Sequence, residues 1–252
     1  MNRRGFAKSL TSSIASYALV RTLFLTDAFA DAIKPVTDHW LRDLHDMSMD
    51  LRQGQITPVQ WQSKVDELFD RVELEYLLRR IDFEKLARGF EFPDLGVHTK
   101  GVRFPALAGL PTGLAFFSKI FGMKQDRAII PHGHRNMVSC HYVIKGDFWL
   151  RHYDKLEDSD THMIIQPTVD ELVRVGSHSA ISDERNNIHW LRAMTQTAFT
   201  YDVIVADLGG EKYEIENIDP YSAEKLANGQ LRVAKISVDE ALRKYGHDTH
   251  HV

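Results

Sequence analysis

The sequence contains one cysteine, Cys140, among 252 residues. A single thiol excludes an internal disulfide, so the stability of the fold has to come from a buried core. Proline (8) and glycine (15) occur at ordinary levels, and 43% of the residues are hydrophobic and 26% charged. This composition is typical of a globular protein, and the length suffices for one main domain with a substantial core.

The sequence also lacks an excess of positive charge and a long apolar run. Its formal net charge is -4, and it has no cluster of Lys and Arg with interleaved aromatic residues. We therefore expect no nucleic-acid partner. No segment offers the roughly 18 uninterrupted apolar residues that a membrane span requires, so we expect no stable span once the signal described next is removed.

The first thirty residues are typical of a targeting sequence. A twin-arginine pair, Arg3-Arg4, precedes a mostly apolar stretch, and Ala28-Phe-Ala30 is a small-x-small cleavage site. This order resembles a Tat export signal and predicts a signal peptide over residues 1–30 of a periplasmic or secreted protein. An amphipathic amino-terminal helix is the alternative, because Arg21 and Asp27 place charges inside the signal.

Residues 31–95 show the periodicity of amphipathic helices. Thr37 is a candidate N-cap for a first helix that ends near Gly54, and Thr57 followed by Pro58 predicts the start of a second. Their apolar stripes consist of Trp40, Leu44, Met47 and Leu51, then Trp61, Val65, Leu68, Phe69 and Val72. A third apolar pattern follows over residues 77–86. The region has no cluster of ligand-type residues, so we interpret it as a helical layer packed on the main domain.

Short runs of β-branched and aromatic residues dominate residues 96–210. The clearest runs span 138–145, 147–153, 162–165 and 198–206. Lys145-Gly146-Asp147 is typical of a hairpin turn between the first two. Strands at this spacing, without helical patterns between them, predict a mainly β barrel or sandwich rather than a parallel sheet. Residues 211–252 mix short patterns, and we interpret them as a carboxy-terminal extension.

Three histidines lie within or beside these apolar runs. His132 and His134 are at i and i+2, so they share one face of a strand, and His189 can approach from a neighbouring strand. Three neutral imidazoles suit a divalent metal and leave coordination positions open, so the spacing predicts a metal site of these three residues. Ordinary hydrogen bonding within a strand is the alternative for each histidine taken singly. Asn186 and Asn187 are candidates for holding the His189 ring.

Two further polar residues are candidates for the same site. In an extended strand His141 faces the same side as the predicted cavity, either as a fourth ligand or as a catalytic group that orients a ligand or substrate. Asp202 lies within an apolar run, where an unpaired carboxylate would be costly, so we expect a hydrogen-bond donor beside it. Cys140 should point to the opposite face as a small buried apolar side chain.

The run from Pro131-His-Gly-His134 to Gly146, followed by Gly176 and His189, resembles the two sequence motifs of the cupin superfamily over roughly residues 128–206. The resemblance implies a mainly β fold, the cupin double-stranded β-helix or jelly-roll barrel, around one metal ion. Cupins usually carry a glutamate seven residues before the glycine, where this sequence has Ser139. This departure resembles the three-histidine branch of the superfamily.

Within that branch, Asn187-Ile-His189 and Tyr201-Asp-Val-Ile204 are similar to thiol dioxygenases that oxidise cysteamine or amino-terminal cysteine, and Asp202 aligns with an aspartate of those enzymes. The resemblance implies Fe(II), with Mn, Ni and Zn as alternatives, and a non-haem dioxygenase that uses O2. Residues after Asp202 do not reproduce the proline-rich, tyrosine-containing element of those enzymes, so the substrate stays open between thiol and phenol-like small molecules.

Two other functions remain open at this point. One is a non-catalytic cupin that binds a small ligand or a metal, since one fold serves both enzymes and binding proteins. The other is a metal-dependent isomerase or decarboxylase, which the absence of the motif glutamate disfavours. A small-molecule substrate and O2 are the expected partners, and a homodimer is an open alternative to a monomer.

Overall fold

The computed structural model describes residues 27–104 and 108–247, with side chains from residue 39 onward. The chain divides into two compact units, Met1–Arg42 and Asp43–Val252. Residues 1–26 of the predicted signal peptide lie outside the described residues. Among the helices of the described ranges, none is both long and apolar enough to cross a membrane. The site discussed below lies entirely within the second unit.

Helix α2 (Asp27–Arg52) begins well before the predicted start, so the assignment of Thr37 as its N-cap is wrong. The preceding segment contains Ala28, Ala30 and Ala32, and alanine has the highest helix propensity, so the helix extends through it. The predicted end is confirmed. Gly54, with a φ of +70°, takes a left-handed conformation shortly after the last helical residue, as helix termini commonly require.

Helix α3 (Pro58–Phe69) begins at the predicted Thr57-Pro58. The Thr57 hydroxyl accepts a hydrogen bond from the Gln60 N–H at 3.2 Å, and the Gln60 side chain accepts one from the Thr57 N–H at 2.8 Å. This reciprocal capping box fixes the start of the helix. The helix buries Trp61, Val65, Leu68 and Phe69. The third apolar pattern forms two short helices, α4 (Leu74–Arg80) and α5 (Phe83–Arg88).

The strands follow in two groups along the chain. The first group is β1 (His98–Val102), β2 (Phe117–Lys124), β3 (Ala128–Arg135), β4 (Met137–Lys145), β5 (Phe148–Asp158), β6 (His162–Val173), β7 (His178–Ile181), β8 (Ile188–Ala193) and β9 (Thr197–Ala206). The second group is β10 (Glu214–Ile218), β11 (Glu224–Lys225) and β12 (Leu231–Ile236). All pairings between these strands are antiparallel, as the sequence predicted.

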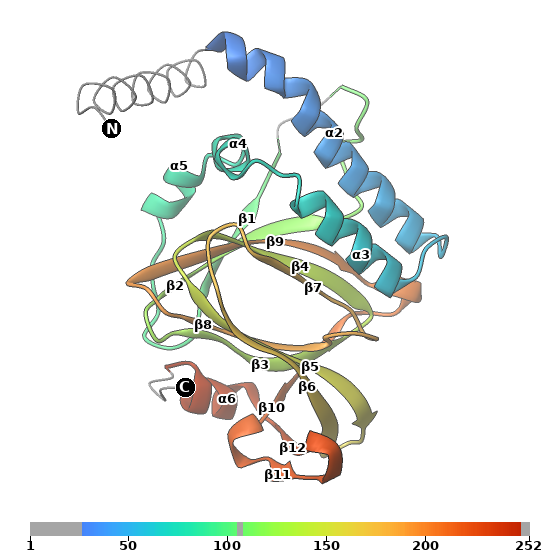
Figure 1. The fold of residues 1–252 in the computed structure, drawn as a ribbon, viewed down its shortest axis with the longest axis vertical. Coiled ribbons are helices and arrows are strands. Elements are labelled where there is room, and N and C mark those ends of the chain that lie inside the picture. Colours follow the sequence, from blue (N-terminus) through green and yellow to red (C-terminus); the bar gives the residue numbers. More distant parts are fainter. Residues whose placement is uncertain (1–26, 105–107, 248–252) are drawn as a thin grey trace, which may run out of the picture. The chain divides into compact units, whose positions relative to one another are not determined.

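Two sheets form the barrel, with strand orders β1-β2-β9-β4-β7 and β10-β3-β8-β5-β6-β12-β11 (Figure 1). Within them the strands pair as nested hairpins, β2 with β9, β3 with β8, β4 with β7 and β5 with β6. Consecutive strands of the first half therefore alternate between the sheets. Such nesting defines a jelly roll, the architecture of cupins. The predicted fold class, a mainly β jelly-roll barrel with amino-terminal helices, is confirmed.

The predicted hairpin at Lys145-Gly146-Asp147 is wrong. β4 and β5 belong to different sheets and do not pair, so this turn carries the chain from one sheet to the other. Gly146 has a φ of +73°, and a Cβ there would lie 2.3 Å from the Thr195 hydroxyl and 2.7 Å from the Thr197 carbonyl oxygen. The local turn chemistry is the same for a hairpin and for a crossing, and only distant strand partners distinguish them.

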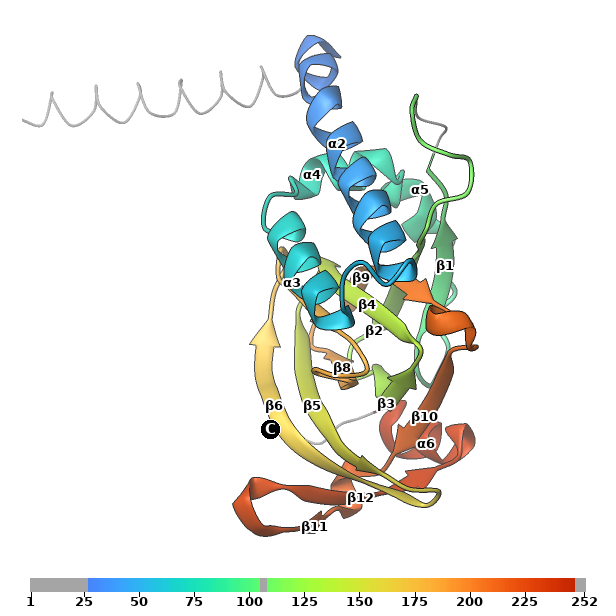
Figure 2. The same cartoon turned by 90° about the vertical axis from the view of Figure 1, so that its right-hand side faces the viewer.

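One helix packs on the outer face of each sheet, α3 on the first and α6 (Val238–Tyr245) on the second (Figure 2). α3 packs on β4 and β7, where the buried Gln62 side chain donates to the Ala180 carbonyl at 2.9 Å and accepts from the Ser182 hydroxyl at 2.7 Å. α6, capped by Ser237, packs on β3 and β10. Between the sheets, an apolar cluster that includes Phe148 and Leu191 fills the interior beside the cavity described below.

Candidate metal centre

The three predicted histidines converge inside the barrel. His132 and His134 lie on β3, and His189 lies on β8 directly opposite His132 in the strand register. One donor atom from each imidazole lies within 4.8 Å of the other two. The ring centroids are 4.6 Å apart for His132 and His134, 4.3 Å for His132 and His189, and 5.0 Å for His134 and His189. A register shift between Ile129 and His132 accompanies this geometry.

Burial keeps these imidazoles neutral. His132, His134 and His189 are 8%, 5% and 2% exposed. Burial lowers the pKa of His132 to about 4, even though a hydrogen bond to the Ile130 carbonyl raises it, and nearby His141 adds to the lowering. Burial also lowers the pKa of His134 and His189 well below the usual value, with neighbouring histidines contributing. A neutral imidazole is the form that binds a metal.

The ring nitrogens are oriented for a common ligand. His132 Nδ1 lies 2.6 Å from the Ile130 carbonyl oxygen, so Nδ1–H donates to it and Nε2 keeps a free lone pair. Both ring nitrogens of His134 and Nδ1 of His189 are buried without a hydrogen-bond partner. Unpaired buried polar atoms are costly, and a divalent metal that takes one nitrogen from each ring relieves part of this cost. The site therefore fits Fe(II), Mn, Ni or Zn.

His141 and Asp202 form a buried pair at the edge of this trio. They lie opposite one another on β4 and β9, and His141 Nδ1 is hydrogen-bonded to Asp202 Oδ2. The expectation of a donor beside Asp202, which is fully buried, is confirmed. The His141 ring centroid lies 4.6 Å from that of His189, and its buried Nε2 has no hydrogen-bond partner. The carboxylate thus fixes the imidazole while Nε2 stays available.

A fifth histidine, His152, was not assigned a role from the sequence. It lies on β5 opposite His189 and is fully buried, with Nε2 3.2 Å from the Ser179 hydroxyl. Burial lowers its pKa to about 3, and His141 adds to the effect. Its ring centroid is 6.4 Å from that of His189. Only the register between β5 and β8 reveals this proximity, and the local sequence contains no signal for it.

Asn187 holds the strand that carries two of the histidines. Its Oδ1 accepts from the His134 N–H at 3.2 Å, and its Nδ2 donates to the His134 carbonyl at 2.8 Å and to the Ser182 carbonyl at 3.2 Å. A Cβ at Gly133 would lie 2.8 Å from this Oδ1, so a glycine permits the approach. The prediction that Asn186 or Asn187 holds the His189 ring is therefore wrong, because Asn187 braces the β3 backbone at His134 instead.

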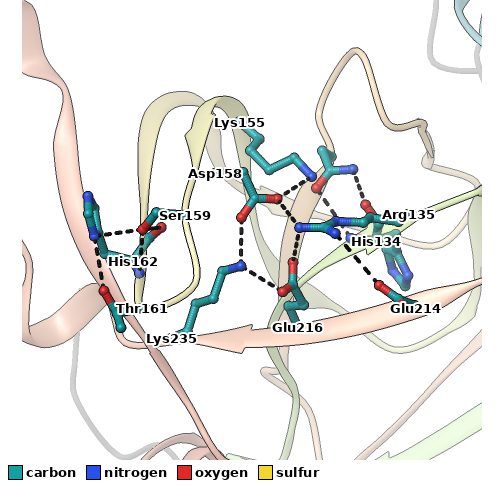
Figure 3. A network of polar contacts seen from close by, with 11 residues as sticks. His134, Arg135, Lys155, Asp158, Ser159, Thr161, His162, Glu214, Glu216 and Lys235 are labelled. Carbon is teal, nitrogen blue, oxygen red and sulfur yellow. Dashed lines mark hydrogen bonds and ion pairs between the residues drawn. The ribbon is translucent and has the colours of Figure 1, made fainter.

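Ion pairs fasten the end of β3 directly after His134 (Figure 3). Arg135 contacts Asp158 at 2.8 Å and Glu216 at 3.4 Å, and Lys235 contacts both carboxylates at 2.6 Å. Burial alone would raise the pKa of Asp158, but hydrogen bonds from Lys235, Arg135 and Lys155 hold it below its usual value. The network joins β3, β5, β10 and β12 beside the histidine strand.

The imidazoles open into a cavity of about 170 Å³. His132, His134, His141, His189 and Asp202 form its polar part. The other lining residues are mostly apolar, namely Phe117, Phe121, Ile129, Met137, Ile204, Tyr213 and Ile215, with Thr99, Lys119 and Ser139. Tyr213 and Ile215 come from the carboxy-terminal extension, because β10 pairs with β3 and places Ile215 opposite His134. The extension thus helps to build the site.

A second cluster lies on the outer face of the other sheet, which contains β4 and β7. Donor atoms of Asp66, Cys140 and His178 lie within 4.8 Å of one another. His178 Nδ1 contacts Asp66 at 3.3 Å and Nε2 contacts Asp70 at 3.0 Å, and the Asp66 hydrogen bond is the main reason why the His178 pKa is raised. Burial raises the pKa of the Cys140 thiol well above its usual value. Cys140 is thus a buried thiol facing away from the cavity, as predicted.

Comparison with known proteins yields structural similarity at low sequence identity. No family model and no curated protein matches the sequence. The 11S globulin procruciferin from Brassica napus matches with a TM-score of 0.34 and 12% identity, over 50% of this chain and 28% of that chain. The pumpkin pro-11S globulin matches with a TM-score of 0.35 and 17% identity, over 50% of this chain and 29% of that chain. KdgF from Halomonas sp. matches with a TM-score of 0.32 and 14% identity, over 46% of this chain and 86% of that chain. This chain thus spans under a third of the globulins' length.

Proposed function

We propose that this chain is a mononuclear non-haem iron oxidoreductase of the dioxygenase type, acting on a thiol or phenol-like small molecule. One observation carries the proposal. Three buried, neutral imidazoles, without a carboxylate among them, meet at a cavity with largely apolar walls. Such a donor set binds a divalent metal facially and leaves positions open for other ligands.

In this proposal His132, His134 and His189 hold the iron. When bound, iron(II) supplies adjacent positions at which substrate and O2 are brought together and exchange electrons. The chain supplies the setting for that chemistry. Burial keeps the three imidazoles neutral, so protons compete with the metal only in acid. Apolar walls exclude water from the reacting groups.

His141 is placed to move a proton. Because Asp202 accepts the hydrogen bond from Nδ1–H, the imidazole carries its free lone pair on Nε2, within the cavity lining. Nε2 takes the proton from the thiol or hydroxyl of the substrate as it binds, and Asp202 stabilises the resulting imidazolium. His141 therefore acts as the base, and Asp202 acts through it as a positioning residue.

The test is anaerobic reconstitution with Fe(II), followed by O2 uptake with a panel of small thiols and phenols. We expect about one iron per chain and uptake that depends on one class of substrate. The matched control is His162→Ala, at a partly buried histidine on β6 that is hydrogen-bonded to Ser159, and it should behave as the wild type. Iron binding without uptake across both substrate classes contradicts an oxygenase.

A second function, binding without turnover, is favoured by one observation. The unpaired Nε2 of His141 belongs to a ring only 4.6 Å from His189, so a fourth imidazole is available to close the coordination sphere. Elemental analysis combined with X-ray absorption of the purified protein separates the two. Zinc or nickel on four nitrogens supports a binding protein, whereas iron or manganese with fewer nitrogens supports an enzyme.

We further propose that the protein is exported through the twin-arginine route, which carries folded and metal-loaded proteins. The support is the pattern of Arg3-Arg4, an apolar stretch and the small residues at 28–30. Mass spectrometry of the protein from a periplasmic fraction should detect a mature chain beginning at Asp31. Retention of the full-length chain in the cytoplasm of an expressing bacterium contradicts export.

A further inference from the structure

The mouth of the cavity carries an exposed apolar rim. Phe117, Tyr213 and Ile215 line the cavity and are 39%, 45% and 50% exposed. Phe117 lies on β2, whereas Tyr213 directly precedes β10 and Ile215 lies on it, so the rim joins segments that are distant in sequence. Large apolar side chains that gather in solvent at the edge of a concavity mark a ligand site. The rim therefore suits the apolar or aromatic body of a ligand.

Lys119 is the one lysine or arginine in the lining. It lies on β2 between Phe117 and Phe121, which face the same cavity, and its Nζ is 5.5 Å from the centroid of the Phe117 ring. Among the described residues, no carboxylate forms an ion pair with it. Asp202, its partner in the strand register, is bonded to His141. A half-buried ammonium without an anion is placed to receive one from a ligand.

The charge of the cavity also favours an anionic ligand. Asp202 and Lys119 are the one carboxylate and the one lysine or arginine of the lining, so their formal charges cancel. A divalent metal on the histidines would make the cavity net positive. A positive, low-dielectric cavity favours an anionic ligand over a neutral one.

We propose that the thiol or phenol-like substrate is also a small organic acid with an apolar or aromatic body, whose carboxylate binds Lys119 while the body packs on Phe117, Tyr213 and Ile215. The inference rests on the proposed function, because it takes this cavity as the substrate site. Its size agrees with a small molecule, since the cavity has about 170 Å³ and an apolar cavity of about 150 Å³ holds benzene.

The test compares two probes that differ only in charge, 3-phenylpropionate and its neutral amide, by titration calorimetry. It uses the iron(II)-loaded protein under anaerobic conditions and the metal-free protein. We expect both forms to bind the acid at least about tenfold more tightly than the amide. Lys119→Met should reduce the difference to within about threefold, and Lys119→Arg should retain it. Lys225→Met, on the exposed strand β11, is the matched control and should behave as the wild type.

Each outcome decides the inference separately from the proposed function. A preference that survives Lys119→Met overturns it, and so does a preference present only with iron bound, because the metal then holds the carboxylate. Equal affinity for acid and amide in the wild type, or no saturable binding of either probe, also overturns it. Failure of the iron site itself is seen in metal content and O2 uptake, while the metal-free titration still reports on Lys119.

Discussion

The two faces of strand β4 place histidines in opposite electrostatic settings. On the inner face, His141 borders the converging trio, where burial lowers the pKa of His132, His134 and His189. On the outer face, His178 of the adjacent strand β7 lies between two carboxylates, which raise its pKa. One residue type thus has a lowered pKa inside the barrel and a raised pKa outside it.

The comparison shows that the surroundings decide the chemistry of a donor cluster. Both clusters bring potential metal ligands within 4.8 Å of one another. Inside, buried ring nitrogens lack hydrogen-bond partners, whereas outside both nitrogens of His178 are already bonded to Asp66 and Asp70. Of these two clusters, the inner one has ring nitrogens free to bind a metal. In the outer cluster, the ring nitrogens of His178 already bind carboxylates of α3 and its C-cap, which holds the helix on the sheet.

The largest expected effect is on metal content, which tests whether the inner cluster rather than the outer one binds the metal. His134→Ala removes one of three ligands, so bound iron should fall from about one per chain to below about one tenth. His178→Ala on the outer face should leave the iron content unchanged. Inductively coupled plasma mass spectrometry after dialysis measures both. Retention of iron by His134→Ala would falsify the inner site, and loss in His178→Ala would assign the metal to the outer cluster.

Asp202→Asn tests the pair at the edge of the trio and should give the next largest effect. The amide keeps the size of the side chain but holds the His141 imidazole less well and does not stabilise its cation. We expect substrate-dependent O2 uptake to fall by about 10–100-fold, with a shifted pH profile, while iron content stays within about twofold. Asp170→Asn on the exposed side of β6 is the control. An unchanged pH profile would show that Asp202 has a purely structural role.

The free energy of unfolding should depend on pH in opposite ways for the inner and the outer histidines. His132 has a pKa of about 4 in the fold against 6.5 when unfolded. The unfolded chain therefore binds more protons between these values, and the metal-free protein should lose stability as the pH falls from 6.5 towards 4. For His132 alone the loss is about 3 kcal/mol. Urea unfolding at several pH values measures it, and His132→Gln should flatten the curve.

His178→Gln should show the smallest effect, with the opposite sign. A raised pKa stabilises the fold below the unfolded pKa, and this contribution is lost as the pH rises through the folded pKa. Because Asp70 is largely exposed, we expect a cost of about 1 kcal/mol in mild acid and none in alkali. Thermal unfolding at two pH values tests this. An equal cost at both would point to packing against Phe69 rather than charge.

Local patterns predicted the features that depend on neighbouring residues. Runs of β-branched and aromatic residues predicted β4, β5, β6 and β9. Thr57-Pro58 predicted the start of α3, and the i, i+2 spacing of His132 and His134 predicted their shared face. These follow from backbone periodicity and capping, which act over a few residues. The approach of His189 from a neighbouring strand was predicted from the same spacing, and the resemblance to cupin motifs agreed with it.

The sequence did not predict which residues far apart in the chain come into contact. The turn at Gly146 satisfies the chemistry of a hairpin, yet β5 finds its partners in the other sheet. His152 meets His189 only through the register of two strands, and the lining role of Tyr213 depends on β10 pairing with β3. In each case the deciding contact joins residues that no local window contains.

Because β10 pairs with β3, residues at the cavity mouth come from a different part of the chain than the converging histidines. Tyr213 and Ile215 shape the cavity mouth from a segment that supplies none of the converging histidines. Mutations in this carboxy-terminal segment can therefore alter which molecules enter while the inner imidazoles stay in place. Related chains with the same histidines and different tails would then diverge in ligand choice, and grafting one tail onto another barrel becomes a direct route to altered selectivity.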